Sequence, residues 1–354
     1  MLVLRTTAAL IAAIFLTVGP LQADQLRIAA WNIANLASQP EQALRGHARS
    51  EEVYQHIREV IDSLDADIIA LQEIGSIPGA ERAVGPDYEV HFESRCLTND
   101  QKCRFDNNDI YTAIAVRKSV SDTVRIEQID ELALYHDDEC CTPPRKVRGS
   151  PVAVVSFGGQ DIWIPSIHLK SACKHGETDV DDVKDDCELN ARQFDVLETW
   201  IAGRPEGDAV ILAGDFNRLL FEAPELVSRL GTDASLLPSP DSRHCWEGYK
   251  FDFTALKKEA RANNPNAYKD GLNPQIYTPK QFGFIDFFVV SGLAGSTATD
   301  ADQVETDAYD TFSNPGDTLT TCDGSPSPFG TNLLTFGSAD PSDHCPIVLT
   351  LTSM

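Results

Sequence analysis

Residues capable of acid–base or metal chemistry stand at the ends of several apolar stretches. The stretch "FIDFF" places Asp286 between aromatic residues, and "SDHCPI" places Asp343 and His344 just before another apolar stretch. A carboxylate in apolar surroundings is costly unless it is paired, hydrogen-bonded or bound to a metal ion. Other members of this set are Asn32, Glu73, His168, Asp215 and Asn217. One shared site explains so many polar ends more simply than separate structural roles do.

The residue types indicate which metal such a site would hold. The histidines show no HExxH spacing and the cysteines show no CxxC pair, so the sequence does not indicate zinc. Carboxylate and amide oxygens dominate the set, and these ligands suit hard divalent cations. We therefore expect Mg²⁺, or in its place Mn²⁺ or Ca²⁺.

The cysteines favour disulfides over nucleophilic catalysis. There is no GxSxG motif, and Cys345 follows His344 directly. Neighbouring residues on a strand point to opposite faces, so Cys345 faces the core if His344 faces the site. Cys96 with Cys103, and Cys173 with Cys187, are spaced to close short loops, while the odd total of nine leaves at least one thiol without an intramolecular partner.

The first 23 residues have the pattern of a cleaved signal peptide. Arg5 precedes an apolar core from Ala8 to Val18, which Gly19 and Pro20 interrupt. The alternative is a membrane anchor, but this apolar run is too short to span a bilayer. The sequence thus predicts a signal peptide at 1–23, a secreted or periplasmic protein, and no stable membrane association after cleavage.

The formal net charge of −25 limits the partners. A chain this acidic has no broad basic surface for holding duplex nucleic acid. If it acts on phosphate esters, a bound cation must supply much of the positive charge. A small basic rim of Arg145, Lys146 and Arg148 could still guide a phosphate backbone locally.

Apolar periodicity predicts many strands and two helices in one domain, residues 24–354. The expected helices span 50–64 and 188–202, and residues 293–341, rich in Asp, Thr, Ser, Gly and Pro, are expected to form a surface-loop insertion. The expected strands are 26–36, 65–74, 109–118, 149–158, 161–171, 208–217, 282–292 and 345–353. This order favours two sheets packed face to face with helices outside.

An ordered set of short motifs resembles the endonuclease/exonuclease/phosphatase superfamily, on its deoxyribonuclease I-like side. The motifs are WN (31–32), QE (72–73), RGSPVAVV (148–155), HLKS (168–171), GDFN (214–217), FID (284–286) and SDH (342–344). The resemblance implies an α+β fold, a four-layer α/β/β/α sandwich of two mostly antiparallel sheets. It also implies divalent-metal-dependent hydrolysis of a phosphodiester.

The resemblance assigns roles to the matching residues. Asn32, Glu73 and Asp343 would hold the metal, and His344 with Asp286 would form the acid–base pair. Asp286 would fix the tautomer of His344 by accepting a hydrogen bond from one ring nitrogen.

Further residues would act on the phosphate itself. Asp215 and Asn217 would contact the scissile phosphate or position water, and His168 would contact the phosphate or protonate the leaving oxygen. The fork-shaped guanidinium of Arg148 suits phosphate oxygens. Asp109 would orient His168 and Tyr111 would touch phosphate, although structural roles fit these last two residues equally well.

The leading functional hypothesis is an exported deoxyribonuclease I-like nuclease that binds DNA or RNA transiently as substrate. The alternative is a phosphodiesterase or phosphatase acting on a lipid head group or a small phosphorylated metabolite. A third hypothesis, a non-catalytic secreted binding or toxin-like protein on the same scaffold, is less favoured, because a binder has no need of Asp286, His168 and His344 together.

Overall fold

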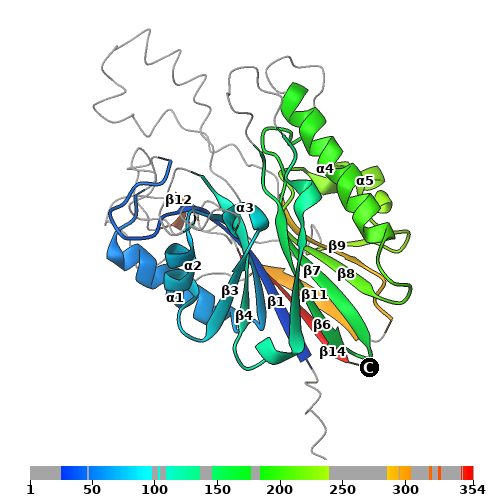
Figure 1. Ribbon diagram of the computed structural model, residues 1–354, viewed down its shortest axis with the longest axis horizontal. Coiled ribbons are helices and arrows are strands. Elements are labelled where there is room, and N and C mark those ends of the chain that lie inside the picture. The colour runs from blue at the N-terminus through cyan, green and yellow to red at the C-terminus, as the bar shows by residue number, and fades with distance from the viewer. Residues whose placement is uncertain are drawn as a thin grey trace, which may run out of the picture.

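Two six-stranded sheets pack face to face in the computed structural model (Figure 1). The structure describes residues 25–45, 48–97, 103, 109–135, 146–176, 184–238, 285–294, 296–303, 319–320, 326–327, 344 and 346–353. Helices cover the outer face of each sheet, so the predicted four-layer α/β/β/α sandwich is confirmed. No helix of the described residues is long and apolar enough to cross a membrane.

The first sheet has the order β11-β14-β1-β2-β4-β3. Its strands are β1 (Gln25–Leu36), β2 (Ile68–Ile74), β3 (Tyr88–Phe92), β4 (Tyr111–Arg117), β11 (Ser296–Gln303) and β14 (Ile347–Ser353). Only β1 and β2 pair in parallel; the other neighbours are antiparallel. The parallel pair requires a crossover, which α1 (Glu51–Leu64) provides.

The second sheet has the order β5-β6-β7-β8-β10-β9. Its strands are β5 (Val124–Ile129), β6 (Ser150–Phe157), β7 (Gln160–His168), β8 (Ala209–Asp215), β9 (Ser235–Leu237) and β10 (Asp286–Ser291). Its one parallel pair, β7 with β8, is connected through α4 (Lys184–Ala202). A separate two-stranded pair joins β12 (Leu319–Thr320) to β13 (Pro326–Ser327).

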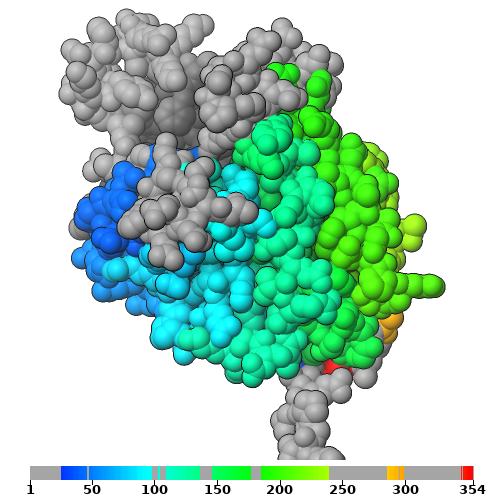
Figure 2. All heavy atoms as spheres, in the orientation of Figure 1, coloured from blue at the N-terminus to red at the C-terminus, as the bar shows by residue number. Residues whose placement is uncertain are grey.

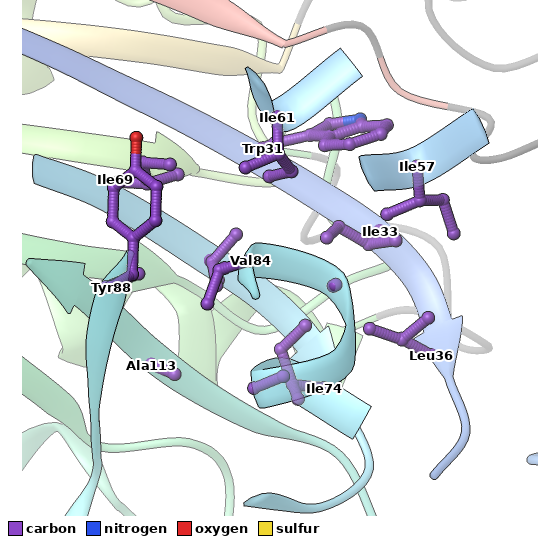
Figure 3. Packing of buried hydrophobic residues seen from close by; sticks show 14 of the residues in the cluster. Trp31, Ile33, Leu36, Ile57, Ile61, Ile69, Ile74, Val84, Tyr88 and Ala113 are labelled. Atoms are coloured by element: carbon purple, nitrogen blue, oxygen red, sulfur yellow. The ribbon is translucent and has the colours of Figure 1, made fainter. Parts of the chain in front are cut away.

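The helices pack on the sheets through apolar stripes. On α1, Val53, Ile57 and Ile61 recur at helical spacing and lie buried against the outer face of the first sheet, beside α2 (Ile77–Val84). Figure 3 shows Trp31 and Ile33 of β1 in this cluster. Helices α4 and α5 (Pro224–Arg229) cover the second sheet (Figure 1). The short α3 (Ser94–Leu97) follows β3.

Another apolar cluster, which we call the inter-sheet layer, lies between the two sheets. It contains alternate residues of the central strands, including Ile28 and Ala30 of β1 and Ile211 and Ala213 of β8. Figure 2 shows the blue-to-cyan first half of the chain meeting the green part along one face of the molecule. The layer therefore ties together strands that are far apart in the sequence.

Most predicted elements are present, with one correction. Residues 296–303, expected in a surface loop, form β11, which pairs with β14 at the edge of the first sheet. The expected disulfides are confirmed: Cys96–Cys103 and Cys173–Cys187 are bonded, with Cα–Cα distances of 5.3 and 4.7 Å. The predicted signal segment 1–23, Asp343, Cys345 and Arg145 lie outside the described residues.

Candidate active site

The site lies at one end of the inter-sheet layer, where the alternating positions change from apolar to polar. On β1 the series runs Ile28, Ala30, Asn32, and on β8 it runs Ile211, Ala213, Asp215. Side chains two residues apart share a face of a strand, so the polar residues continue the same layer. Gln72 of β2, His168 of β7 and Asp286 of β10 occupy the corresponding positions. The strands thus deliver all of them to one place.

Sheet pairing sets the neighbours of Asp215. In the second sheet Asp215 is paired with His168 of β7 on one side and with Asp286 of β10 on the other. In the first sheet Asn32 is paired with Gln72. Three strands of one sheet and two of the other therefore meet at this end of the sandwich.

A tight bend follows Asn32 and fixes its side chain. Ala34 and Asn35 have left-handed φ values of 44° and 59°, a conformation that L-residues adopt at a cost. The backbone N–H of Ala34 donates to Oδ1 of Asn32 at 2.9 Å. The buried guanidinium of Arg49 donates to the carbonyls of Ile33, Ala34 and Asn35 at 2.9, 2.6 and 3.1 Å. Sequence reasoning missed Arg49, because its partners are backbone atoms with no sequence signal.

The end of β2 is also irregular. Glu73 has a φ of 61°, and the pairing register of β2 shifts between Leu71 and Ile74. Just before it, Nε2 of Gln72 donates to the hydroxyl of Ser166 on the opposite sheet at 3.0 Å, and that hydroxyl donates to the Leu71 carbonyl at 3.1 Å. These cross-sheet hydrogen bonds hold β2 in place next to Glu73, whose side chain contacts Asn32 in the site.

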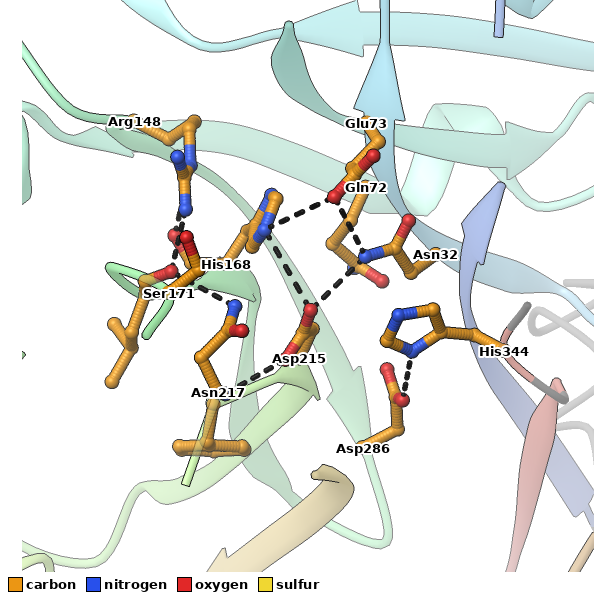
Figure 4. Close-up of polar contacts among 12 residues, drawn as sticks. Asn32, Gln72, Glu73, Arg148, His168, Ser171, Asp215, Asn217, Asp286 and His344 are labelled. Atoms are coloured by element: carbon orange, nitrogen blue, oxygen red, sulfur yellow. Dashed lines mark hydrogen bonds and ion pairs between the residues drawn. The ribbon is translucent and has the colours of Figure 1, made fainter. Parts of the chain in front are cut away.

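A hydrogen-bonded network connects the two sheets at the site (Figure 4). The amide nitrogen of Asn32 lies 3.0 Å from Oδ2 of Asp215 and 3.4 Å from Oε1 of Glu73. Nε2 of His168 lies 3.6 Å from the same Asp215 oxygen and 3.7 Å from the same Glu73 oxygen. These two His168 distances exceed hydrogen-bond length, so the imidazole faces the carboxylates without being held by them.

Asp215 is the most strongly perturbed carboxyl of the site. Burial, and then the negative charge of Asp286, raise the pKa of Asp215 to about 7. The backbone N–H of Asn217 donates to its Oδ1 at 2.7 Å, which opposes the rise because it stabilises the charged form. The raised pKa thus comes first from burial of the carboxyl and second from the neighbouring negative charge of Asp286.

Burial and the positive charge of Arg148 hold the pKa of His168 well below its usual value. The ring is therefore neutral at neutral pH. Its Nδ1 is buried and has no hydrogen-bond partner among the described residues. A neutral imidazole can donate one hydrogen bond to a phosphate oxygen without adding charge.

His344 and Asp286 form a direct pair. Nδ1 of His344 lies 2.5 Å from Oδ2 of Asp286, whose carboxylate is 2% exposed. The carboxylate accepts from Nδ1–H and so selects the tautomer that leaves Nε2 to exchange a proton. The indole N–H of Trp31 donates to the His344 carbonyl at 2.9 Å and holds its backbone. The predicted pairing of these two residues is present.

Arg148 and Asn217 share one acceptor. The carbonyl of Leu169 accepts from Nη2 of Arg148 at 2.5 Å and from the side-chain amide of Asn217 at 3.1 Å. Nε of Arg148 also donates to the His168 carbonyl at 3.3 Å. Burial lowers the pKa of Arg148 to about 10, which still leaves it charged at neutral pH. The turn after β7 thus fixes Arg148 and Asn217, two of the four residues predicted to bind phosphate.

A buried ion pair, missed by sequence reasoning, supports the chain beside Arg148. Glu93 is fully buried and accepts from Nε and Nη2 of Arg95 at 2.8 and 2.7 Å. It also accepts from the backbone N–H of Gly149 at 2.6 Å, and the hydroxyl of Thr112 donates to the Gly149 carbonyl at 2.9 Å. Glu93 follows the stretch "YEVHF", so the strand-end signal that identified Glu73 could have found it.

Asp109 and Tyr111 lie beside this ion pair. Oδ2 of Asp109 is 3.4 Å from Nη1 of Arg95. The ring of Tyr111 is 1% exposed, packs edge-on against Phe92 and lies under the guanidinium of Arg95, on the outer face of β4. The proposed roles of Asp109 and Tyr111 in catalysis stay predictions.

The donor set fits a hard divalent cation. Asp215, Asp286 and His344 each offer a ligand atom within 4.8 Å of the others. His344 and Asp286 already bond to each other at 2.5 Å. The amide oxygen of Asn32 accepts from the N–H of Ala34, and its amide nitrogen, a donor, faces Asp215 and Glu73, so the metal-binding roles of Asn32 and Glu73 stay predictions. The raised pKa of Asp215 supports this fit, since a cation among these oxygens would offset their mutual repulsion.

Comparisons with known proteins identify the family of this chain. The sequence profile of the Endonuclease/Exonuclease/phosphatase family matches residues 29–344. The chain therefore belongs to that family, and it is a phosphoester hydrolase. The comparison with curated proteins gives no significant match.

Solved structures share the fold at low identity. TDP2 from D. rerio, complexed with a single-strand DNA product, aligns with a TM-score of 0.52 and 17% identity, over 93% of this chain and 99% of that one. TDP2 from C. elegans aligns at 0.51 and 16%, over 95% and 77%. A functionally unknown conserved protein from Enterococcus faecalis V583 aligns at 0.51 and 13%, over 93% and 100%.

Proposed function

We propose that this protein is an exported, divalent-metal-dependent phosphodiesterase that cleaves nucleic acid, in the manner of a deoxyribonuclease I-like nuclease. One observation carries the proposal: the His344–Asp286 pair, the buried Asp215 and the Arg148–His168 side of the site converge at one end of the inter-sheet layer. A signal-like segment at residues 1–23 supports export to the periplasm or the medium. The D. rerio TDP2 complex with single-strand DNA supports nucleic acid as the substrate class.

The chain's own residues account for positioning and proton transfer. Arg148 binds the non-bridging phosphate oxygens and compensates their charge, and the side chains of Asn217 and neutral His168 donate hydrogen bonds to them. Nε2 of His344 accepts a proton from the attacking water, and Asp286 stabilises the resulting imidazolium. His168, pointing toward the carboxylates from the opposite side, is placed to donate a hydrogen bond to the leaving oxygen.

Glu73 and Asn32, with Asp343 as a further predicted ligand, would hold the cation. When bound, such a cation neutralises phosphate charge and lowers the pKa of water. Mg²⁺ is the preferred ion, and Mn²⁺ or Ca²⁺ are alternatives with the same oxygen-ligand chemistry.

The test is hydrolysis by the protein lacking residues 1–23. Single-stranded DNA, plasmid DNA, RNA, sphingomyelin vesicles and bis-p-nitrophenyl phosphate are incubated with Mg²⁺ or with EDTA. We expect Mg²⁺-dependent cleavage of nucleic acid, and a loss of at least about 10²-fold in kcat in His344→Ala, the size of a lost general base. Cleavage of the lipid and not of nucleic acid, or full activity in His344→Ala, contradicts the proposal.

A further inference from the structure

An exposed aromatic side chain lies opposite the segment that leads to Arg148. Tyr135 is 53% exposed, and it is one of three exposed large hydrophobic side chains in the part of the chain that the structure describes. It forms an isolated antiparallel bridge with Lys146, two residues before Arg148. The backbone N–H of Val147 donates to the Leu134 carbonyl at 2.9 Å, which fixes this ribbon.

Strand geometry puts Tyr135, Lys146 and Arg148 on one face. The Val147 hydrogen bond makes Tyr135 and Lys146 a non-hydrogen-bonded pair, the type whose side chains lie closest. The ammonium of Lys146 lies 5.0 Å from the centre of the Tyr135 ring. Val147 is 6% exposed and points inward, so its neighbours Lys146 and Arg148 point the other way.

The backbone of this ribbon is fixed on the scaffold of the active site. Nη1 of Arg95 donates to the Lys146 carbonyl at 3.2 Å, and Glu93 accepts from the N–H of Gly149. Consecutive Cα atoms are about 3.8 Å apart, so the Lys146 backbone lies within roughly 8 Å of that of Arg148. Tyr135, which lies opposite Lys146 in the bridge, is thus held beside the segment that carries Arg148.

We propose that Tyr135 and Lys146 form a subsite for the nucleotide that neighbours the scissile phosphate, in which the base stacks on the Tyr135 ring and Lys146 faces the backbone. The inference rests on the proposed function. Aromatic side chains bind bases of single strands by stacking without strong sequence preference. A phenol ring is rigid and loses little conformational entropy on binding, which explains why an exposed ring can contribute affinity. A subsite of this kind needs only a local cation, which is compatible with the net charge of −25.

The test measures the contribution of one base to kcat/KM separately from that of the rest of the substrate. Short single-stranded thymidine oligonucleotides carry one cleavable phosphodiester among phosphorothioates, and a tetrahydrofuran residue replaces the base at one position at a time. We measure kcat/KM with Mg²⁺ for the unchanged protein, Tyr135→Leu and Tyr135→Phe. Thermal unfolding of each variant checks that the exposed substitution leaves the fold intact.

We expect one position next to the cleaved bond at which base removal lowers kcat/KM about 10-fold in the unchanged protein and in Tyr135→Phe, the usual effect of losing one stacked base. In Tyr135→Leu, kcat/KM for the intact substrate should already be lower by that factor. Removing the base at that position should not lower it further. An equal effect of base removal in the unchanged protein and in Tyr135→Leu, at every position, overturns the proposal.

A binding measurement keeps this result distinct from the proposed function. Fluorescence anisotropy of the same oligonucleotides in EDTA gives Kd without hydrolysis. Tyr135→Leu and Lys146→Ala should each raise Kd, while Lys118→Ala, a matched lysine at the far end of β4, should not. If no phosphodiester is cleaved at all, the proposed function fails, and the anisotropy still decides the subsite. If Tyr135→Leu binds sphingomyelin vesicles more weakly than the unchanged protein and has the same Kd for the oligonucleotides, the subsite proposal is overturned in favour of a lipid contact.

Discussion

At the scale of residues, the site concentrates negative charge where little water reaches. Asp215 and Asp286 are paired on adjacent strands and are 1% and 2% exposed. Burial, and then the negative charge of Asp286, raise the pKa of Asp215 to about 7. The site is therefore built at a cost to stability that a bound cation can offset.

This cost predicts a pH-dependent effect of Asp215→Asn. With a folded-state pKa of about 7 against 3.8 unfolded, the folded protein binds the extra proton, so Asp215 lowers stability as pH rises from about 4 to 7. In EDTA, Asp215→Asn should raise the free energy of unfolding at pH 8 by at most ~4 kcal/mol and by much less at pH 5. Urea unfolding at both pH values measures this. An increase in the free energy of unfolding that is larger at pH 5 than at pH 8 contradicts this prediction.

Arg49 predicts a positioning effect through Asn32. Three carbonyls of the left-handed bend accept from its guanidinium, and the same bend bonds Oδ1 of Asn32. Arg49→Met should lower kcat about 10-fold or more while changing KM little, because about 1 Å of displacement in a reacting group costs up to 10²-fold. Arg49→Lys should recover part of kcat. Metal affinity, followed by Mn²⁺ titration, should weaken in parallel in Arg49→Met, and unchanged Mn²⁺ affinity would exclude this route.

At the scale of elements, the sequence predicts the central strands of both sheets and does not predict the edge strands. The strands β1, β2, β7 and β8 are continuous apolar runs because both of their faces are buried. Of the edge strands, β5 (VRIEQI) mixes apolar and polar residues and β11 (STATDADQ) is mostly polar, so neither has that signal. The sequence motifs predict which side chains meet at the site, because alternation along each strand determines the face of the sheet on which a side chain lies. The left-handed turns at Asn35 and Glu73 depend on contacts with distant residues and had no local signal.

The link between the two sheets at Glu93 predicts a coupled loss of stability and activity. Its carboxylate accepts from Arg95, from Gly149 of the second sheet and, at 3.3 Å, from the N–H of Thr112. Glu93→Gln replaces one acceptor by a donor and leaves the Arg95 charge buried, which typically costs about 3–5 kcal/mol. Glu93→Gln with Arg95→Met should recover much of this loss. Urea unfolding measures the stabilities, and additive losses in the double variant would show that the pair is not coupled.

At the scale of the whole molecule, the charge balance opposes the proposed substrate. A nucleic acid approaches a protein whose formal net charge is −25, while Arg148 and Lys146 attract it only locally. Charges farther apart than about 8 Å are largely screened at 0.15 M ionic strength, whereas contacts inside the site are screened much less. Salt should thus weaken the long-range repulsion more than the local attraction.

This argument predicts an unusual salt dependence of nuclease activity. For most nucleic-acid-binding proteins, affinity falls steeply with added salt because phosphate contacts release counterions. Here kcat/KM for a single-stranded oligonucleotide should stay level or rise about 2- to 5-fold between roughly 20 and 150 mM KCl, as the overall repulsion is screened. A neutral-headgroup substrate such as sphingomyelin should show no such rise. A steep fall with the oligonucleotide would mean that basic side chains outside the described residues dominate the encounter, and the local-subsite picture of Tyr135 and Lys146 would then be incomplete.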